Sequence, residues 1–167
     1  MSNVRVLFVC LGNICRSPMA EAVFRSKLQQ AGLDGIVEVD SAGTGDWHIG
    51  HPPHEGTRKQ LDLKGISYAG MKARQFIGQD NDQFDYIVCM DTKNEKDVRE
   101  LIDGAVSGAD KGRGAEVLTF MSLLPEKGIV DVPDPYYTGN FDYVYELVDE
   151  GCDRLLEQVR SALKGSN

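Results

Sequence analysis

The sequence has no run of basic residues and no long apolar run. In 167 residues, 18 Lys and Arg stand against 26 Asp and Glu, which gives a formal net charge of −8. Nucleic acids and anionic lipid surfaces attract clustered positive charge, so this acidic chain is a poor candidate for either partner. No apolar stretch approaches the ~20 residues that span a bilayer. We expect no nucleic-acid partner and no membrane insertion, although a local positive field can still bind one phosphate group.

Cysteine is also scarce. The four cysteines, Cys10, Cys15, Cys89 and Cys152, are too few and too scattered for the disulfide framework of a small secreted protein. The short apolar stretch at the N-terminus ends at Gly12 without the small-residue cleavage site of a signal peptide. The sequence therefore predicts a cytoplasmic protein whose cysteines are thiols, either buried or reactive.

No pattern for a cofactor or a metal is present. Gly43-Thr44-Gly45 lacks the third glycine of a dinucleotide-binding loop, and no Gly-Lys pair exists for an ATP-type phosphate loop. His48, His51 and His54 recur every third residue, but two prolines interrupt them and no carboxylate or cysteine completes a ligand set. We expect a solvated loop there, with no metal and no cofactor.

Strand-like and helix-like segments alternate along the chain. The expected strands are rich in β-branched and aromatic residues, at 4–9, 36–40, 84–90 and 117–120. Helices are expected over 17–31, 55–63, 93–102 and 141–163; the first and the last have apolar residues at helical spacing, and the third is charged. This alternation predicts an α/β fold, a three-layer sandwich with a central four-stranded parallel sheet flanked by helices. Residues 1–167 contain no internal repeat or linker and are expected to form one domain, with an exposed Gly-rich loop over 103–114.

The residues that can carry chemistry cluster between the first expected strand and the first expected helix. The strand delivers Cys10 to the carboxyl edge of the sheet, where ligands of open α/β folds bind. Gly12 and Asn13 tolerate the left-handed backbone with which a loop curls its N–H groups around an anion. Arg16 can clamp a trigonal oxyanion with two donors. We interpret the loop as a phosphate-transfer site with a cysteine nucleophile, whose thiolate is favoured near a helix N-terminus.

Three residues of this loop have a second interpretation. Cys10 alone could be a buried residue at a strand end, because free cysteine packs as a small hydrophobe. Ser17 could cap the helix or donate a hydrogen bond to the thiolate. Cys15 could be a packed residue, or it could form a disulfide with Cys10 that shelters the nucleophile from over-oxidation. The combined Cys-x5-Arg-Ser spacing favours chemistry over packing.

Cleavage of a phosphoester through a cysteinyl-phosphate also needs a proton donor for the leaving oxygen and a base for water. Asp134 is the candidate, because Pro133 and Pro135 stiffen its loop and can hold the carboxyl over a neighbouring site. An ordinary Asp-Pro turn is the alternative. Tyr136 and Tyr137 follow directly and suit a wall that stacks on an aromatic substrate ring.

Residues Val9–Glu21 and the segment Asp134–Tyr137 resemble the low-molecular-weight protein tyrosine phosphatases. Further segments resemble the family in the same order, namely Asp40-Ser41, Asp46-Trp47, Ala73-Arg74-Gln75 and Phe84–Asp91. The resemblance covers essentially the whole chain and implies the phosphotyrosine phosphatase I-like fold. It also implies an enzyme that hydrolyses phosphotyrosine in proteins, and small aryl phosphates, through a cysteinyl-phosphate intermediate.

The same resemblance implies a role for each residue of the site. Cys10 is implied to be the nucleophile, Arg16 the phosphate clamp and Asp134 the general acid and base. The residues implied to bind phosphate or to form the substrate walls are Leu11, Gly12, Asn13, Ile14, Cys15, Ser17, Trp47 and Tyr136. Those implied to support the loop are Asn13, Ser17 and Ser41, with Ser17 beside the thiolate. Tyr136 and Tyr137 resemble positions that are phosphorylated in some members.

One departure from the family pattern concerns the loop asparagine. Members often carry a histidine before the Lys-Ala-Arg-Gln segment, where it helps to hold that strained residue, but this chain has Met71. Methionine cannot donate the hydrogen bond. Either Ser41 and its neighbours suffice to hold Asn13, or the loop is softer than in those members.

Three related functions compete with this interpretation. Arsenate reductases pass oxidation to two further cysteines on a mobile segment, whereas Cys89 lies in an expected strand and Cys152 on the apolar face of an expected helix. Arginine phosphatases typically carry threonine at the position of Ile14, and a bulky apolar residue suits phosphotyrosine better. A binding module without turnover is disfavoured, because nucleophile, clamp and acid are all present. The expected partner is a phosphotyrosine-containing protein, and the expected state is a monomer, with a weak dimer as the alternative.

Overall fold

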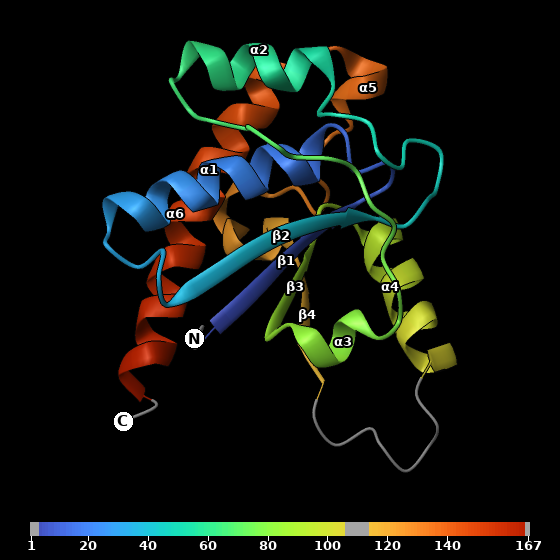
Figure 1. Ribbon diagram of the computed structural model, residues 1–167, viewed down its shortest axis with the longest axis vertical. Coiled ribbons are helices and arrows are strands. Elements are labelled where there is room, and N and C mark those ends of the chain that lie inside the picture. The colour runs from blue at the N-terminus through green and yellow to red at the C-terminus, as the bar shows by residue number, and fades with distance from the viewer. Residues whose placement is uncertain (1–3, 106–113, 166–167) are drawn as a thin grey trace.

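The computed structural model describes residues 4–105 and 114–165 and contains a four-stranded parallel sheet (Figure 1). Its strands are β1 (Val4–Cys10), β2 (Val37–Gly43), β3 (Tyr86–Cys89) and β4 (Glu116–Thr119). They lie in the order β2-β1-β3-β4, so β1 is central and pairs with both β2 and β3. Because all strands are parallel, their carboxyl ends share one edge of the sheet, and Cys10 ends the central strand there.

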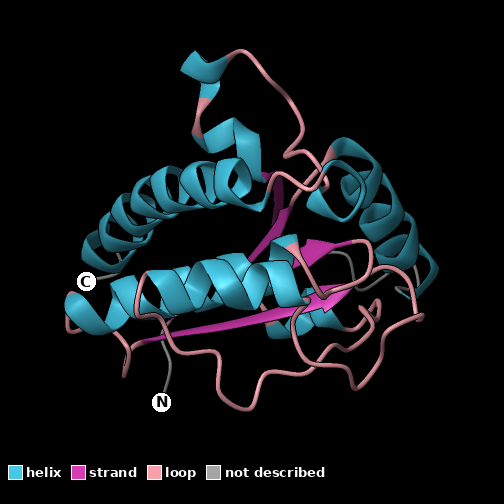
Figure 2. Ribbon diagram, turned by 90° about the horizontal axis from the view of Figure 1, so that it is seen from above, coloured by secondary structure: helices cyan, strands magenta, loops and turns pink. Residues whose placement is uncertain are grey.

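Helices cover both faces of this sheet (Figure 2). The longer helices are α1 (Arg16–Gln30), α2 (Glu55–Leu63), α4 (Thr92–Ala105) and α6 (Phe141–Gly165). The shorter ones are α3 (Asp80–Gln83), α5 (Pro135–Thr138) and two 3-10 helices, η2 (Phe120–Leu123) and η3 (Pro125–Lys127). None of the helices in the described ranges is long and apolar enough to cross a membrane.

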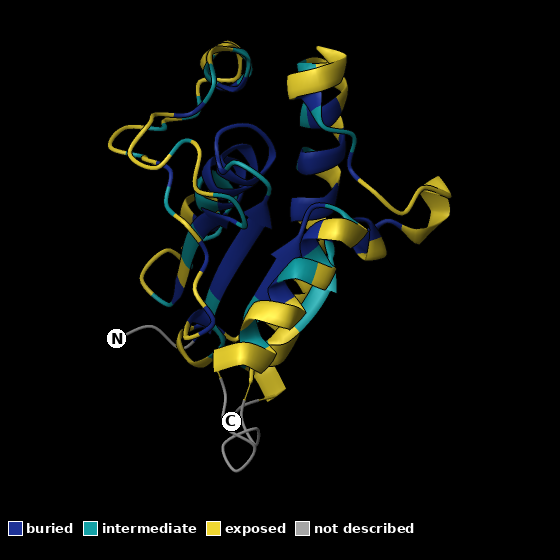
Figure 3. Ribbon diagram, turned by 90° about the vertical axis from the view of Figure 1, so that its right-hand side faces the viewer, coloured by how far each residue is buried: buried dark blue, intermediate teal, exposed yellow. Residues whose placement is uncertain are grey.

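The two faces of β1 enter two different hydrophobic clusters. Val6 and Phe8 pack with α1 and α6, whereas Leu7 and Val9 pack with Val98 of α4 and its neighbours. All four of these strand residues are fully buried, and Figure 3 shows dark blue strand segments in the interior with exposed positions on the helices. The predicted three-layer α/β sandwich with a central parallel sheet is therefore confirmed.

The last helix shows why one glycine is needed in this packing. The α6 residues that face the core recur at helical spacing and are Val144, Leu147, Val148, Gly151, Cys152, Leu155 and Val159. A Cβ atom on Gly151 would lie 2.2 Å from the ring of Phe120. The helix can therefore approach η2 this closely only with glycine at that position.

The structure corrects several predicted boundaries. The second strand runs on to Gly43, three residues beyond the predicted end, which places Ser41 inside β2. The third strand is confined to Tyr86–Cys89, and Phe120 belongs to η2 rather than to the fourth strand. Helix α4 continues to Ala105, into the stretch predicted as an exposed loop over 103–114, most of which falls on residues 106–113, outside the described part of the chain.

Candidate active site

The loop between β1 and α1 curls tightly at the carboxyl edge of the sheet. Asn13 has a φ of 57°, the one positive value among the described non-glycine residues. Gly43, at the end of β2, lies directly beneath the loop, because a Cβ there would sit 2.8 Å from the carbonyl oxygen of Leu11. The loop is further tied to the chain after β2, since Thr44 and Gly45 donate backbone hydrogen bonds of 2.9 Å to Cys10 and Leu11.

Cys10 is buried at the base of this loop, with hydrogen-bonding groups around its sulfur. The backbone N–H of Asn13 donates to Sγ at 3.3 Å, and Ser17 Oγ lies 2.9 Å from Sγ. Ser17 does not cap the helix, as one interpretation had it, because α1 begins at Arg16 with Cys15 at the N-cap and no side-chain cap bond. Ser17 Oγ instead lies within hydrogen-bonding distance of the Cys10 sulfur, where the hydroxyl can stabilise a thiolate.

The carboxamide of Asn13 uses all of its hydrogen-bonding groups. Its Nδ2 donates to Ser17 Oγ at 2.8 Å and to Ser41 Oγ at 2.9 Å. Its Oδ1 accepts from the backbone N–H of Arg74 at 2.9 Å. Met71, which stands where the family often has histidine, has its sulfur 3.8 Å from a guanidinium nitrogen of Arg25. Ser41 and its neighbours therefore hold the strained asparagine, which is the first of the two alternatives considered from the sequence.

Arg16 is 2% exposed and is anchored at one side of its guanidinium. Nη1 donates to Oδ2 of Asp91 at 2.8 Å and to the carbonyl oxygen of Val132 at 2.9 Å, while Nη2 lies 3.4 Å from Oδ2 of Asp134. Burial alone would lower the pKa of Arg16, but the charges of Cys10, Asp91 and Asp134 outweigh burial and raise the pKa above its usual value. The guanidinium therefore keeps its charge in the pocket.

The contact of Arg16 with Asp91 was missed by the sequence interpretation, although Asp91 closes one of the segments that resemble the family. Asp91 Oδ1 accepts from the backbone N–H of Asn94 at 2.7 Å, as a residue preceding a helix does. Its other oxygen is thereby aimed at Arg16. Sequence spacing carries no signal for this pair, because 75 residues separate the two side chains.

Asp134 is the N-cap of α5, a four-residue helix that the sequence did not predict. Its Oδ1 accepts from the backbone N–H of Tyr136 at 3.1 Å, and its Oδ2 faces Arg16. The Asp-Pro turn and the candidate acid are thus one feature, since the turn that starts α5 also holds the carboxylate at the pocket.

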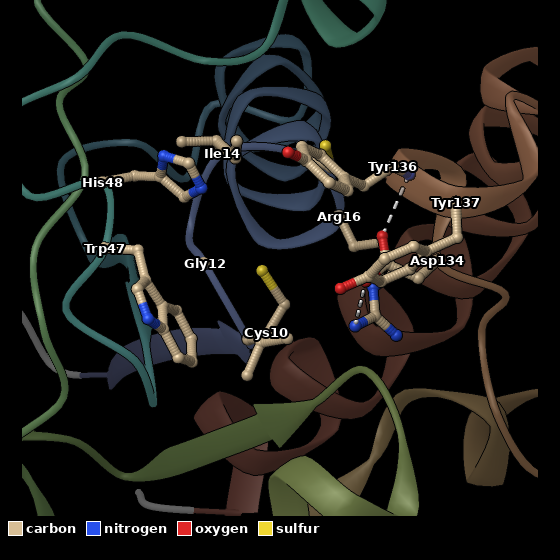
Figure 4. Close-up of a pocket in the computed structure, with 11 residues that line it drawn as sticks. Cys10, Gly12, Ile14, Arg16, Trp47, His48, Asp134, Tyr136 and Tyr137 are labelled. Atoms are coloured by element: carbon tan, nitrogen blue, oxygen red, sulfur yellow. Dashed lines mark hydrogen bonds and ion pairs between the residues drawn. The ribbon is translucent and has the colours of Figure 1, made fainter.

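These side chains line one cavity of about 330 Å³ (Figure 4). The residues that line it are Cys10, Leu11, Gly12, Ile14, Cys15, Arg16, Trp47, His48, Asp134, Tyr136 and Tyr137. In the view of Figure 4, Trp47 and His48 lie on one side of Cys10, and Asp134 with the two tyrosines lies on the other. Asn13, Ser17 and Ser41, which the resemblance implied to support the loop, do not line the cavity and are joined by hydrogen bonds from the Asn13 carboxamide.

The predicted solvated loop of three histidines is wrong for two of them. His48 lines the cavity, with its ring centroid 6.4 Å from that of Tyr136. His54 stacks on Phe141, and its Nδ1 accepts from the backbone N–H of Gly56 at the start of α2. His51 is exposed, and across the described residues no group of His, Cys, Asp and Glu side chains is arranged to hold a metal ion.

The remaining cysteines are free thiols in buried positions. Burial, followed by the charges of Cys10 and Asp134, raises the pKa of Cys15, and Arg16 opposes the shift only in part. Burial likewise raises the pKa of Cys89 in β3 and of Cys152 in α6. Both lie in regular elements of the core, which does not fit the mobile cysteine relay of an arsenate reductase.

Comparison with known proteins agrees with this geometry. The model of the family described as low molecular weight phosphotyrosine protein phosphatase matches residues 5–164. The chain belongs to this family. The low molecular weight protein-tyrosine-phosphatase YfkJ of Bacillus subtilis is 48% identical over 157 residues, which cover 94% of this chain and 96% of YfkJ.

Solved structures also match over nearly the whole chain. The crystal structure of YfkJ superposes with a TM-score of 0.88 at 46% identity, covering 97% of this chain and 98% of that one. The crystal structure of a Drosophila arginine phosphatase superposes with a TM-score of 0.82 at 30% identity, covering 92% and 96%. The phosphatase fold predicted from the sequence is therefore confirmed.

Proposed function

We propose that this chain is a protein tyrosine phosphatase that hydrolyses phosphotyrosine through a cysteinyl-phosphate on Cys10. The observation that carries the proposal is the meeting of three side chains in one cavity: the Cys10 sulfur, the Arg16 guanidinium and the Asp134 carboxyl. A thiol, a planar cation and a carboxyl are the groups that phosphoryl transfer through a covalent intermediate requires.

In the first step, Cys10 Sγ attacks phosphorus and the bond between phosphorus and the tyrosine oxygen breaks. Asp134, as the carboxylic acid, donates its proton to the departing phenolic oxygen. Arg16 keeps Nη1 on Asp91 and Val132, so that Nη2 and Nε serve the phosphoryl oxygens. The backbone N–H groups of the loop provide the remaining donors, because the curl at Asn13 turns them inward.

In the second step, water attacks phosphorus and the bond between sulfur and phosphorus breaks. The Asp134 carboxylate accepts a proton from this water, which restores the acid for the next cycle. The Cys10 thiolate leaves and receives a hydrogen bond from Ser17. Inorganic phosphate is released, and no cofactor takes part in the proposal.

The walls of the cavity suit an aromatic ring. Trp47 is 65% exposed and Tyr136 is 53% exposed, so both rings remain accessible to a substrate. Ile14 adds an apolar surface at the base of the cavity. The proposal therefore places the phosphate on the loop and the tyrosine ring between the Trp47 and Tyr136 sides.

We further propose the context in which the enzyme works. Its partner is a phosphotyrosine-containing protein, and it acts as a monomer in the cytoplasm, with a weak dimer as the alternative state. Residues 1–167 form the one phosphatase domain of this proposal, which needs neither nucleic acid nor a membrane.

The test is hydrolysis of p-nitrophenyl phosphate and of a phosphotyrosine peptide by the wild type and by Cys10→Ser. Cys152→Ala, which removes a thiol from the core, is the control and is expected to keep its activity. Cys10→Ser is expected to bind inorganic phosphate without turnover, because the loop and Arg16 remain. Appreciable turnover by that variant would contradict the covalent mechanism. Faster hydrolysis of phosphoarginine than of phosphotyrosine would contradict the proposed substrate and indicate an arginine phosphatase.

A further inference from the structure

The hydrogen bonds that hold Asn13 continue beyond the phosphate loop to a buried ion pair on α1. Ser41 accepts from Nδ2 of Asn13 at 2.9 Å and donates its own hydroxyl hydrogen to Oε1 of Glu21 at 2.6 Å. On the other side, Nδ2 of Asn13 donates to Ser17 at 2.8 Å, and Ser17 lies 2.9 Å from the Cys10 sulfur. One chain of polar groups therefore joins Glu21 to the nucleophile.

Glu21 is the acceptor at which this chain ends, and its side chain is only 8% exposed. A carboxylate so buried is costly unless a positive charge accompanies it. Among the described residues, the cation that pairs with Glu21 is Arg25, one helical turn further along α1, through Nη2 and Oε2. Nη2 also donates to the carbonyl oxygen of Val39 in β2 at 3.2 Å, so the guanidinium is fixed to the sheet as well.

The direction in which the Ser41 hydroxyl points depends on the Glu21 carboxylate. A serine hydroxyl has one hydrogen, and the carboxylate takes that of Ser41, so a lone pair of Ser41 faces Asn13. Without the carboxylate acceptor, the Ser41 hydroxyl is free to turn its hydrogen toward the Asn13 amide, which sets donor against donor. Asn13 then loses one support for its left-handed backbone conformation. For a non-glycine residue this conformation is less stable than the β-region or the right-handed helical region.

We propose that Arg25 is a positioning residue for the phosphatase reaction: its charge orients Glu21, Glu21 orients Ser41, and Ser41 holds Asn13 in the conformation that the Cys10 loop requires. Met71 lies against the same guanidinium, with Sδ 3.8 Å from Nη1 of Arg25. The kinetic part of this inference rests on the proposed function.

A substitution at Arg25 can be made without opening a void in the core. The Arg25 side chain is 36% exposed and borders a polar surface cavity of about 550 Å³, together with Asp40 and Lys72. Methionine at position 25 keeps an aliphatic side chain on α1 and removes the positive charge. The effect of Arg25→Met therefore reports on the ion pair.

Helix α4 provides a matched control. Arg99 pairs with Glu95 four residues earlier at 2.9 Å, and Nη2 of Arg99 donates to the carbonyl oxygen of Val117 in β4 at 3.0 Å. The pair thus repeats the spacing and the strand contact of Arg25 and Glu21, but it does not reach the phosphate loop. Arg99→Met is the control for the loss of an arginine–glutamate pair as such.

The experiment measures kcat and KM for p-nitrophenyl phosphate and the affinity for inorganic phosphate in both variants. Losing a charge-assisted hydrogen bond corresponds to roughly a 10- to 100-fold effect at the bond itself. This effect reaches the loop through Ser41. We therefore expect Arg25→Met to lower kcat about tenfold and to weaken phosphate binding, with KM changed less. Arg99→Met is expected to match the wild type. Equal kcat and phosphate affinity in the two variants would overturn the proposal.

Two further variants separate charge from packing. If Arg25→Met fails to fold, Arg25→Gln replaces it, and Arg99→Gln becomes the control. The Arg25→Gln side chain is neutral but can still donate a hydrogen bond to Glu21. The same comparison of kcat and phosphate affinity then decides. In the double variant Arg25→Met with Met71→His, an imidazolium restores the charge beside Glu21. The proposal is supported if kcat and phosphate affinity of the double variant, relative to the wild type, recover at about pH 5.5 and fall again by about pH 8. The reason is that imidazole is charged only at the lower pH. Equal recovery at both pH values overturns the proposal.

Failure of the proposed function is distinguishable from failure of this inference. A wild-type chain that binds phosphate but hydrolyses no phosphoester would contradict the proposed function. The comparison of Arg25→Met with Arg99→Met would still be decided by phosphate affinity, which reports on the loop without turnover.

Discussion

Oδ2 of Asp134 lies 3.4 Å from Nη2 of Arg16, a longer contact than the 2.8 and 2.9 Å bonds that Nη1 of Arg16 makes with Asp91 and Val132. Charge-assisted hydrogen bonds are usually about 2.7–2.9 Å long, so Nη2 is the weakly held side of the guanidinium. A phosphoryl oxygen can take over Nη2 while Nη1 stays anchored. The candidate clamp and the candidate acid therefore meet at Nη2, one of the two nitrogens that the proposed mechanism turns toward the phosphoryl oxygens.

Arg16→Lys is expected to lower kcat by roughly 10²–10³-fold, the usual effect of removing a preorganised donor from a developing charge. An ammonium group is a point charge and cannot hold Asp91, the Val132 carbonyl and a phosphoryl oxygen with the geometry of a planar fork. The measurement is kcat with p-nitrophenyl phosphate, with Arg99→Lys as the control. Near-normal kcat in Arg16→Lys would show that charge alone is sufficient.

Asp134→Asn is expected to slow hydrolysis of phosphotyrosine by roughly 10²–10⁴-fold, the range of general acid catalysis. The loss should shrink for aryl phosphates with good leaving groups, because these need less protonation. The measurement is the rate against the acidity of the leaving phenol in wild type and variant. A parallel loss across the whole series would mean that Asp134 shapes the pocket and that another group donates the proton.

Mild peroxide is expected to inactivate the enzyme, and a thiol reductant to restore it, if Cys15 forms a disulfide with oxidised Cys10. Because burial raises the pKa of Cys15, its thiolate fraction grows as pH rises above neutrality, and disulfide closure should become faster in the same direction. Cys15→Ser should recover less completely after reduction, whereas Cys152→Ser should recover like the wild type. Identical recovery in all three proteins would leave Cys15 without a protective role.

The pairing of α1 with α6 is expected to weaken at high pH. Lys27 Nζ lies 2.8 Å from both Asp149 and Asp153; burial alone would lower its pKa, but these two carboxylates raise it to about 12. Because the pKa of Lys27 is higher in the folded state than in the unfolded state, its ion pairs stabilise the folded protein. This contribution is complete at pH values below the unfolded pKa of about 10.4, and it is lost as the pH rises toward 12.

Lys27→Met should therefore lower the free energy of unfolding by about 1 kcal/mol near neutral pH. The difference from the wild type should narrow by about pH 11 as Lys27 begins to lose its charge. Urea unfolding at several pH values provides the measurement. Lys93→Met is the control, because the Lys93–Asp97 pair is exposed and 3.8 Å long. A difference that stays constant with pH would mean that packing of the Lys27 stem, and not its charge, accounts for the loss.

The parts of the fold with long periodic patterns could be predicted from the sequence. Helix α2 begins and ends at the predicted residues, and the central strand was placed to within one residue, because apolar spacing records burial directly. The short helices α3 and α5 were not predicted, since four residues are too few to show a period. Their positions depend on side chains such as Asp134, whose capping bond is visible only in three dimensions.

The site shows the same division. The loop residues were predicted together because they are neighbours in the sequence and their types match one chemistry. Asp91, which binds Arg16, and His48, which lines the cavity, were missed because each meets the loop through the packing of segments that are distant in the sequence. Ser17 was assigned two roles from the sequence, and only the distances to Cys10 and Asn13 decide between them.

The contacts of Arg16 join the start of the chain to residues that are synthesised much later. Its partners Asp91, Val132 and Asp134 lie 75, 116 and 118 residues further along the chain. Because ribosomes build from the N-terminus, the phosphate loop emerges long before the residues that anchor its arginine and supply its acid. A nascent chain, or a fragment ending before Val132, carries the thiol and Asp91 but lacks Val132 and the candidate acid Asp134. On the proposed mechanism, the growing polypeptide acquires its acid and the full set of Arg16 contacts only after most of its length has been synthesised and has folded back onto its beginning.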